Sequence, residues 1–419
     1  MATWLHVSAG YAPIIGGGEK YIQTMSERFV EAGDDVVVAT TNAACAEHWW
    51  DPRQPALQPG VDYLNGVRVI RSRVAHLPAA PYSCLLVRRL AGWVPPRDEF
   101  IPLLNTLGNY LPWIPGFEGV LEKQAWNAQL VHAINVIWEG PVLAAHRFAR
   151  RRGLPFVFTP FLHIGEPQVE RYYTRPHQLR LLRASDAVIA QTELEANALI
   201  HRGVPAHRLH MLGMGVDLDT LHGGDAERFR QRYGIRAPLV TFMGAVTYDK
   251  GAVHLTQAMR RLWQRNQQAT LALAGRAIAV GGYNRFFDQL SGDERQRILR
   301  LGEVAGELKQ DLLAATDVFV MPSRVDAFGI VFLEAWAYGI PVIGAAAGGI
   351  PGVIEHNVDG LLVPFGDVDK LADSIADLLN DQAKACAFGA RGRAKVEARY
   401  TWDRVYSDLR AIYTRLASG

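Results

Sequence analysis

Residues 318–344 of this 419-residue chain, VFVMPSRVDAFGIVFLEAWAYGIPVIG, constrain its fold more than any other stretch. The apolar run Val318–Met321 has the length of a buried strand and ends at a proline. A helix is predicted over residues 328–338, because Gly339 follows where helices commonly end and Pro341 prevents continuation. A second apolar run then begins. The order strand, loop, helix, strand is the repeating unit of a parallel sheet.

The start of this predicted helix is also a candidate anion site. The first residues of a helix have backbone N–H groups without intrahelical partners, and such ends favour phosphate. Asp326 precedes the helix and Glu334 lies inside it. A nucleotide sugar needs amides for its phosphates and carboxylates for its hydroxyls. Alternatively, Asp326 is only an N-cap and Glu334 only a solvated helix residue. The amides at this end belong to Phe328, Gly329, Ile330 and Val331.

The composition is that of a well-packed, nearly neutral protein. Hydrophobic residues make up 49% of the chain and charged residues 21%, so two or three domains with large cores are expected. The 44 Lys and Arg against 42 Asp and Glu give no support for a nucleic-acid binder. Three cysteines without a CxxC pair disfavour a disulfide framework or a zinc site. No signal-peptide pattern or spanning apolar run is evident, so a cytoplasmic protein is expected.

The N-terminal half opens with a strand, a glycine-rich turn, a helix and a strand. Gly16 and Gly17 lie in the turn, between an apolar run at residues 4–8 and a helical pattern at residues 21–32. This order is typical of nucleotide-binding βαβ units, although the glycines alone fit a flexible loop equally well. The turn does not match GxGxxG, and no acid ends the second strand. Both observations disfavour a dinucleotide-dependent oxidoreductase.

Further apolar runs predict a succession of strands with helical patterns between them. They lie at residues 36–40, 66–73, 129–134, 155–159, 185–190, 239–243, 270–274, 298–302, 317–322 and 360–364. Such alternation indicates an α/β protein with parallel sheets.

Several motifs resemble those of family 4 retaining glycosyltransferases, which have the GT-B fold. That family carries Pro-Ser, then Glu-x-Phe-Gly, Glu-Ala and Gly-x-Pro-Val within one stretch. This chain has Pro322-Ser323, Asp326-Ala327-Phe328-Gly329, Glu334-Ala335 and Gly339-Ile340-Pro341-Val342. It departs from the pattern at Asp326, where the family usually has Glu, so the charge is kept on a side chain one methylene shorter. Weaker matches extend over nearly the whole chain.

The resemblance implies two Rossmann-like parallel-sheet lobes with an inter-lobe cleft. The acceptor-side domain is expected over residues 1–216 and the nucleotide-sugar-binding domain over residues 217–397, with Gly213 and Gly215 in the linking segment. A C-terminal helix within residues 398–419 is expected to cross back to the first lobe. The donor, a UDP or GDP sugar, would bind in the cleft as a substrate, with no cofactor and no metal.

The resemblance also implies a cationic clamp for the donor diphosphate. Lys250 matches the family lysine, whereas Ala245 stands where the family has an arginine. Loss of that cation would cost about 1.5 to 3 kcal/mol if nothing replaces it. Arg324 or Arg276 could replace it. Taken alone, a Lys-Gly pair such as Lys250-Gly251 is more often a surface loop.

Other residues acquire expected roles from the same family. His163 falls at the family's active-site histidine, at the end of a strand where ligands of parallel sheets collect. Asp326 is expected to bind hydroxyls of the donor sugar, and Glu334 the nucleoside ribose. We interpret His132 as a core or cleft-wall residue. The donor diphosphate is expected to contact Gly16, Gly17, and the amides of Phe328, Gly329, Ile330 and Val331.

Residues 75–126 do not follow the alternation of strands and helices. They hold seven prolines and three tryptophans, together with apolar residues such as Leu85 and Leu86 and nearby arginines such as Arg88. We favour a pair of short helices that cover the core, joined by proline-rich connectors. The alternative is an acceptor-binding or membrane-surface patch, because aromatic and arginine side chains suit an interface.

The resemblance therefore implies a retaining, metal-independent hexosyltransferase. It would move a sugar from a nucleotide diphosphate sugar to a hydroxyl of a carbohydrate or lipid-linked acceptor, with a membrane contact through residues 75–126 as an open alternative. No Asp-x-Asp motif is assigned to the diphosphate and no nucleophile is evident. One alternative is a nucleotide-sugar epimerase, which would consume donor without acceptor. Another is a non-catalytic nucleotide-sugar binder, because Ala245 and Asp326 depart from the family pattern.

Overall fold

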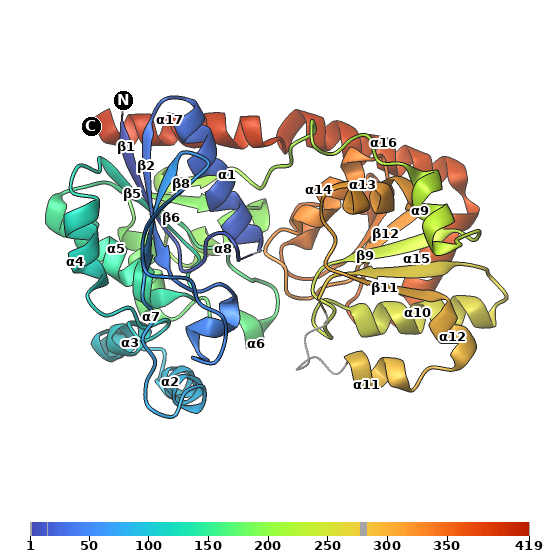
Figure 1. Cartoon of the computed structure of the whole chain (residues 1–419), viewed down its shortest axis with the longest axis horizontal. Helices are drawn as coiled ribbons and strands as arrows, with labels where there is room; N and C mark the ends of the chain where they lie inside the picture. The colour runs from blue at the N-terminus through green and yellow to red at the C-terminus, as the bar shows by residue number, and fades with distance from the viewer. Residues whose placement is uncertain (1, 15, 277–282, 419) are drawn as a thin grey trace. The chain divides into compact units, whose positions relative to one another are not determined.

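The computed structural model describes residues 2–14, 16–276 and 283–418, which form two compact units (Figure 1). Each unit has its own largely parallel sheet with helices on both faces. The expected α/β class with two Rossmann-like lobes is confirmed. Unit 1 comprises Met1–Leu162, Pro167–Gly213 and Val405–Gly419, and unit 2 comprises His163–Glu166 and Met214–Arg404.

Unit 1 contains an eight-stranded sheet in the order β3-β4-β2-β1-β5-β6-β7-β8. Neighbouring strands are parallel except for the β3–β4 hairpin. The chain order reverses between β1 and β5, and ligands of such sheets bind beyond the carboxyl ends at this switch point. The strands are β1 (Thr3–Val7), β2 (Asp35–Thr41), β3 (Gly60–Leu64), β4 (Val67–Ser72), β5 (Leu130–Ile134), β6 (Phe156–Thr159), β7 (Ala187–Ala190) and β8 (Leu209–Met211).

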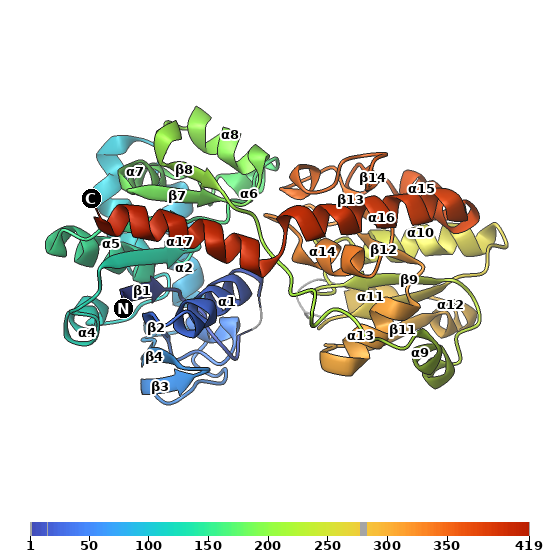
Figure 2. The ribbon, with the colours of Figure 1, turned by 90° about the horizontal axis from the view of Figure 1, so that it is seen from above.

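Helices of unit 1 cover both faces of this sheet. They are α1 (Gly17–Glu31), α2 (Tyr82–Trp93), α3 (Ile101–Gly108), α4 (Phe117–Gln124), α5 (Glu139–Arg152), α6 (Pro167–Glu170), α7 (Pro176–Ala184), α8 (Glu193–His201) and, from Val405 onward, α17 (Trp402–Ser418). The last helix lies against α1 (Figure 2), where the ring of Tyr413 stacks on that of Phe29 at a centroid distance of 4.9 Å. The C-terminal residues therefore complete the core of unit 1.

The segment of residues 75–126 forms three α-helices, α2, α3 and α4, instead of a pair. Leu104 of α3 and Leu121 of α4 are buried, as core-covering helices require. Leu85 and Leu86 of α2 are 56% and 52% exposed. The core-covering interpretation is therefore wrong for α2, which turns most of its large apolar side chains to solvent.

Unit 2 contains a six-stranded, fully parallel sheet in the order β11-β10-β9-β12-β13-β14. Its switch point lies between β9 and β12, which pair directly. The strands are β9 (Leu239–Met243), β10 (Thr270–Ala274), β11 (Ile298–Gly302), β12 (Val318–Met321), β13 (Val342–Ala345) and β14 (Gly360–Val363). The helices are α9 (Ala226–Tyr233), α10 (Ala252–Gln264), α11 (Tyr283–Asp288), α12 (Gly292–Gln296), α13 (Gly306–Ala315), α14 (Ile330–Ala337), α15 (Val368–Asn380) and α16 (Gln382–Arg399).

Candidate functional site

Lys250 and Asp326 lie on two loops that leave neighbouring strands at the switch point of unit 2. Because β9 and β12 are parallel and paired, the loops after them begin side by side at the carboxyl edge of the sheet. The Nζ of Lys250 donates to Oδ2 of Asp326 at 2.8 Å and to the carbonyl oxygen of Val325 at 3.3 Å. The Lys250 and Asp326 side chains are 25% and 17% exposed. The structure thus joins two of the residues predicted to be catalytic in one partly buried ion pair.

The glycine-rich turn after β13 fixes the backbone of Asp326. The N–H of Gly349 donates to the carbonyl oxygen of Asp326 at 2.7 Å. A Cβ on Gly348 would lie 2.5 Å from that oxygen, and a Cβ on Gly349 would lie 1.9 Å from the carbonyl oxygen of Ala327. Only glycines allow the two loops to approach so closely. The turn therefore holds Asp326 where Lys250 reaches it.

Helix α14 begins two residues later than predicted. Its N-cap is Gly329, with a left-handed φ of 86°, and its first residue is Ile330. Phe328 belongs to the preceding loop, where its side chain is buried. The N-cap interpretation of Asp326 is wrong, because Gly329 occupies that position. Glycine has no side chain to cap the first-turn amides of Ile330 and Val331, so this end keeps the character of an anion site.

Glu334 lies in the second turn of α14. Its Oε1 accepts a hydrogen bond from Nζ of Lys309 in α13 at 2.7 Å, and only 14% of its side chain is exposed. The interpretation of Glu334 as a solvated helix residue is therefore wrong. Its proposed contact with a ribose stays a prediction.

Arg324 already forms an ion pair with the carboxylate of Asp249. Its Nε and Nη2 donate to Oδ1 of Asp249 at 2.9 and 2.7 Å, and its guanidinium carbon lies 5.3 Å from the ring centroid of Phe365. To replace the cation missing at Ala245, Arg324 would have to leave this pair. Arg276 is exposed, and its carbonyl oxygen accepts from the N–H of Val246 at 3.0 Å.

His163 belongs to the short segment of chain that clusters with unit 2. Burial lowers the pKa of His163 to about 4; the charge of Lys250 lowers it as well, and Asp326 acts in the opposite direction. The imidazole is therefore neutral at pH 7. The three residues predicted to be catalytic thus interact electrostatically within one unit.

Glu195 supports the turn before His163 and was missed in the sequence. Its carboxylate accepts the N–H groups of Leu162 and Gln191, both at 2.7 Å. Burial raises the pKa of Glu195 to about 7 even though these hydrogen bonds favour the charged form. A capping pattern was available as a signal, since the side chain of Thr192 accepts from the N–H of Glu195.

Gly16 and Gly17 lie in unit 1 at the N-terminus of α1. Gly16 is the N-cap in extended conformation, and Gly17 is the first helical residue. A Cβ on Gly16 would lie 2.2 Å from Oε2 of Glu19, so this carboxylate is close to the helix end. Burial raises the pKa of Glu19. The two glycines thus begin an ordered helix, and their contact with a diphosphate stays a prediction.

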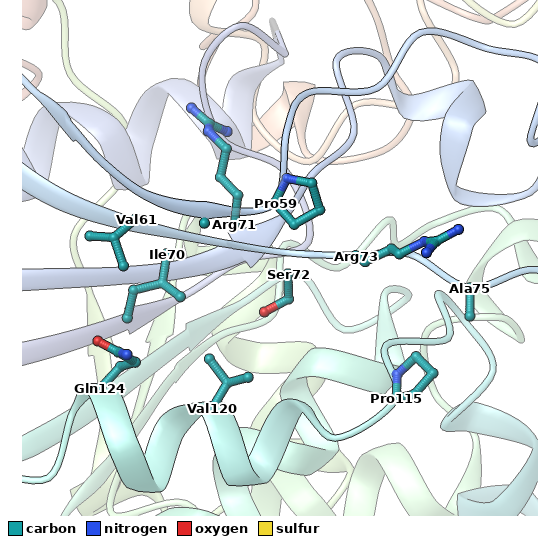
Figure 3. A pocket seen from close by; sticks show the side chains of 11 residues that line it. Pro59, Val61, Ile70, Arg71, Ser72, Arg73, Ala75, Pro115, Val120 and Gln124 are labelled. Carbon is teal, nitrogen blue, oxygen red and sulfur yellow. The ribbon is translucent and has the colours of Figure 1, made fainter.

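A pocket of about 440 Å³ lies elsewhere in unit 1, between the β3–β4 hairpin and α4. Figure 3 shows Ile70 and Ser72 pointing from β4 toward Val120 and Gln124 of α4, with Arg71 pointing to the other side of the strand. None of the residues predicted to bind donor lines it. Its lining is largely aliphatic, so it is not the predicted site.

Two further features concern the part of the chain that the structure describes. No helix in it is both long and apolar enough to cross a membrane. It contains no group of three or more His, Cys, Asp or Glu side chains that could hold a metal ion.

The two α/β units, each with a Rossmann-like sheet, define a protein of the GT-B class. Two family models then cover most of the chain. "Glycosyl transferase 4-like domain" matches residues 16–215, and "Glycosyl transferases group 1" matches residues 225–395. The chain belongs to the group 1 glycosyltransferases, as its motifs predicted.

Individual relatives agree with this assignment. A D-inositol 3-phosphate glycosyltransferase of Xylanimonas cellulosilytica is 30% identical over 424 residues, covering 96% of this chain and 92% of the relative. A GDP-mannose-dependent alpha-(1-6)-phosphatidylinositol monomannoside mannosyltransferase of Mycobacterium tuberculosis is 36% identical over 217 residues, covering 49% and 55%. Anabaena HepE, solved with UDP-glucose, shares the fold with a TM-score of 0.73 at 19% identity, covering 99% of this chain and 100% of that one. The chain is therefore an enzyme of the hexosyltransferase class.

Proposed function

We propose that this enzyme transfers a sugar from a UDP or GDP sugar to an acceptor hydroxyl with retention of configuration and without a metal. The observation that carries the proposal is the Lys250–Asp326 ion pair at the switch point of unit 2, next to the uncapped start of α14. The proposed donor-binding domain spans residues 217–397. The acceptor-side domain spans residues 1–216 and includes the C-terminal helix within residues 398–419.

Binding of the donor would separate Lys250 from Asp326, because each residue would bind a different part of the donor. The diphosphate would attract Lys250, and the hydroxyls of the sugar would bind the carboxylate of Asp326. The amides of Ile330 and Val331 would add donors for the phosphate oxygens. Glu334 would bind the ribose. Two similar proteins support a nucleotide sugar, since one is named as GDP-mannose-dependent and HepE was solved with UDP-glucose.

Catalysis would rest on stabilisation of the leaving nucleoside diphosphate. Its charge grows in the transition state, and Lys250 with the helix amides would meet that charge without a metal. His163, neutral at pH 7, would act as a hydrogen-bonding wall of the sugar pocket and not as a cation. No side chain is assigned as nucleophile, so we propose a same-face displacement in which a donor phosphate oxygen takes the acceptor proton. No cofactor is required.

The acceptor is proposed to be a carbohydrate or a lipid-linked hydroxyl compound. Two relatives carry inositol 3-phosphate and phosphatidylinositol monomannoside in their names. We also propose that the protein is cytoplasmic and contacts the inner face of the membrane through residues 75–126. The exposed apolar side chains of α2 support this contact.

The test is to incubate the enzyme with a panel of UDP and GDP sugars, with and without acceptor, in EDTA. Proton NMR of the product would report its anomeric configuration. Retained configuration and turnover in EDTA are expected. An inverted product, or turnover that only magnesium or manganese restores, would overturn the corresponding part of the proposal. Donor consumed at the same rate without acceptor would instead favour an epimerase.

A further inference from the structure

Helix α2 exposes an unusual share of the large apolar side chains of this protein. Among the described residues, fourteen large hydrophobic side chains are exposed, and five of them lie on this helix of 12 residues. An apolar surface of this density on a soluble domain marks an interaction site. The five are Tyr82, 78% exposed, Leu85, 56%, Leu86, 52%, Leu90, 40%, and Trp93, 69%.

These five side chains lie on one face of the helix, which they share with Arg89. With a turn of 3.6 residues, Tyr82, Leu86 and Trp93 project in nearly the same direction, and the other two flank them. The opposite side of the helix carries Cys84 and Ala91, both buried. Helix α2 packs on α3, which in turn packs on α7, so α2 is the outer layer at this end of unit 1 (Figure 1). The apolar face is therefore directed outward by the packing of the helix.

A cluster of arginines lies at the side of this helix. The guanidinium carbons of Arg171 and Arg175 lie 4.9 and 5.5 Å from the ring centroid of Tyr172. Arg175 touches α2 directly, since a Cβ on Gly92 would be 3.7 Å from its Nη2. Burial lowers the pKa of Arg175; Glu139 opposes this effect, and the charges of Arg88 and Arg171 reinforce it. Arg88 lies one helical turn before Gly92 on the same side of α2, so it belongs to the same cluster.

The cluster lacks a carboxylate of its own. Arg175 is only 9% exposed, and within residues 2–14, 16–276 and 283–418 neither its guanidinium nor that of Arg88 forms an ion pair. Glu139, the acid whose charge acts on Arg175, is occupied, because its oxygens accept from Nε2 of His177 and Nε2 of Gln178, both at 2.8 Å. A buried arginine next to two further cations and no free acid suits an external anion.

The charge of this surface decides which partner fits it. The sequence of α2, YSCLLVRRLAGW, contains two arginines and no acid. A second copy packed on this face would bring Arg89, which lies within the apolar face, close to its own counterpart. An anionic bilayer instead offers hydrocarbon for the leucines, an interfacial zone for Tyr82 and Trp93, and phosphates for the arginines.

We infer that unit 1 docks on an anionic lipid surface through α2, with its apolar face among the headgroups and Arg88, Arg171 and Arg175 on one lipid phosphate. The inference narrows the proposed membrane contact from residues 75–126 to one helix and one anion site. It rests on the surface of unit 1 and does not depend on the transfer reaction.

Sedimentation of the full chain with vesicles tests this docking. The protein should bind phosphatidylcholine vesicles that contain phosphatidylglycerol, and added salt should weaken this binding. Leu86→Ser with Trp93→Ser should weaken partitioning at least about tenfold. Arg88→Gln with Arg171→Gln should weaken it about fivefold for each charge, and only on vesicles with phosphatidylglycerol. All four positions are at least partly exposed, so the variants should fold.

Matched controls lie outside the patch. Met211→Ser, 59% exposed in unit 1, and Arg236→Gln, exposed in unit 2, should sediment like the wild type. Wild-type protein that stays in solution, or patch variants that bind as well as the wild type, would overturn the inference. Thermal stabilisation by inorganic phosphate without vesicle binding would indicate a soluble anion. A dimer that only the apolar variants dissociate would indicate a second copy. Neither sedimentation nor its failure bears on sugar transfer, which is measured separately.

Discussion

At the scale of single residues, the site depends on a lysine that already has a partner. Lys250 is bound to Asp326, and Arg324 is bound to Asp249, so both cations of these loops are paired before any donor arrives. Ion pairs of this kind keep the loops ordered at little net gain in stability. In the proposed site, the diphosphate of the donor would displace the carboxylate of Asp326 because its charge is larger. Lys250 should therefore contribute most of the cationic stabilisation of the leaving group.

Lys250→Ala should then reduce kcat/KM by at least about 2.7 kcal/mol, roughly a hundredfold. Most of the loss should appear in kcat, because the charge it stabilises develops in the transition state. Steady-state turnover with donor and acceptor measures the effect. Lys370→Ala, at an exposed position of α15, is the matched control. A Lys250→Ala enzyme within about threefold of the wild type would show that another cation serves the diphosphate.

Ala245 offers the reverse experiment. Ala245→Arg supplies a cation where the family has one, so it should tighten binding of the nucleoside diphosphate at least about tenfold. Calorimetry with UDP and GDP measures this affinity. Ala245→Gln adds bulk without charge and should leave the affinity near that of the wild type. Equal effects of the two substitutions would mean that this position does not face the diphosphate.

Glu195 acts one step away from the site, through the turn before His163. In Glu195→Gln one oxygen must serve two N–H groups, and the new amide donor faces a backbone donor. We expect a loss of about 1 to 3 kcal/mol in unfolding free energy, measured by urea titration. Glu193→Gln changes an exposed residue of the same helix and should be neutral. Equal stability of the two variants would show that Glu195 does not hold the turn.

At the scale of elements, the succession of strands and helices was predictable, because apolar runs bounded by Gly and Pro have few other interpretations. The start of α14 was missed by two residues. A glycine in the left-handed conformation at the N-cap and a glycine inside the first turn look alike in a sequence. The hairpin strand β3 was also missed, since its residues are mostly exposed and form no apolar run. The exposed face of α2 was foreseen only as the less favoured alternative, because its pattern does not say whether core or partner covers it.

The glycine-rich turn after β13 packs against the loop after β12, so a substitution in the turn should affect both. Gly349→Ala places a Cβ 1.9 Å from the carbonyl oxygen of Ala327, so the loop that carries Asp326 must move. Overpacking of this kind should cost about 1 to 3 kcal/mol and should also lower kcat. Gly292→Ala, where a Cβ would meet nothing within 4 Å, is the control for unfolding and turnover. Full activity of Gly349→Ala would show that the position of this turn does not matter for catalysis.

At the scale of the whole molecule, residues from opposite ends of the chain build one core. Tyr413 in α17 shares hydrogen bonds with Nδ1 of His132 at 2.5 Å and with Nε2 of His6 at 3.0 Å. Nδ1 of His6 faces the hydroxyl of Ser26 in α1 at 2.7 Å. The sequence placed His132 in the core or the wall of a cleft, and it is fully buried. Its partner lies 281 residues away, a distance that no local pattern spans.

This buried chain of polar groups makes unit 1 sensitive to acid. Burial lowers the pKa of His6 from 6.5 to about 3 and also lowers the pKa of His132. Below pH 6.5, His6 is protonated in the unfolded state but stays neutral in the folded state. The unfolding free energy should therefore be largest above pH 6.5. It should fall by about 1.4 kcal/mol per pH unit for this histidine until pH approaches the folded pKa.

His6→Gln isolates this contribution because glutamine can still donate and accept hydrogen bonds but does not titrate. Urea unfolding from about pH 7 to about pH 4 should show a slope that is shallower than in the wild type by about 1.4 kcal/mol per pH unit. Carboxylates contribute equally to both proteins, so the difference reports His6. His207→Gln, at an exposed position of unit 1, should keep the wild-type slope. If His6→Gln also keeps the wild-type slope, then His6 is protonated in the folded state. The buried hydrogen-bonded groups around it must then accommodate that charge.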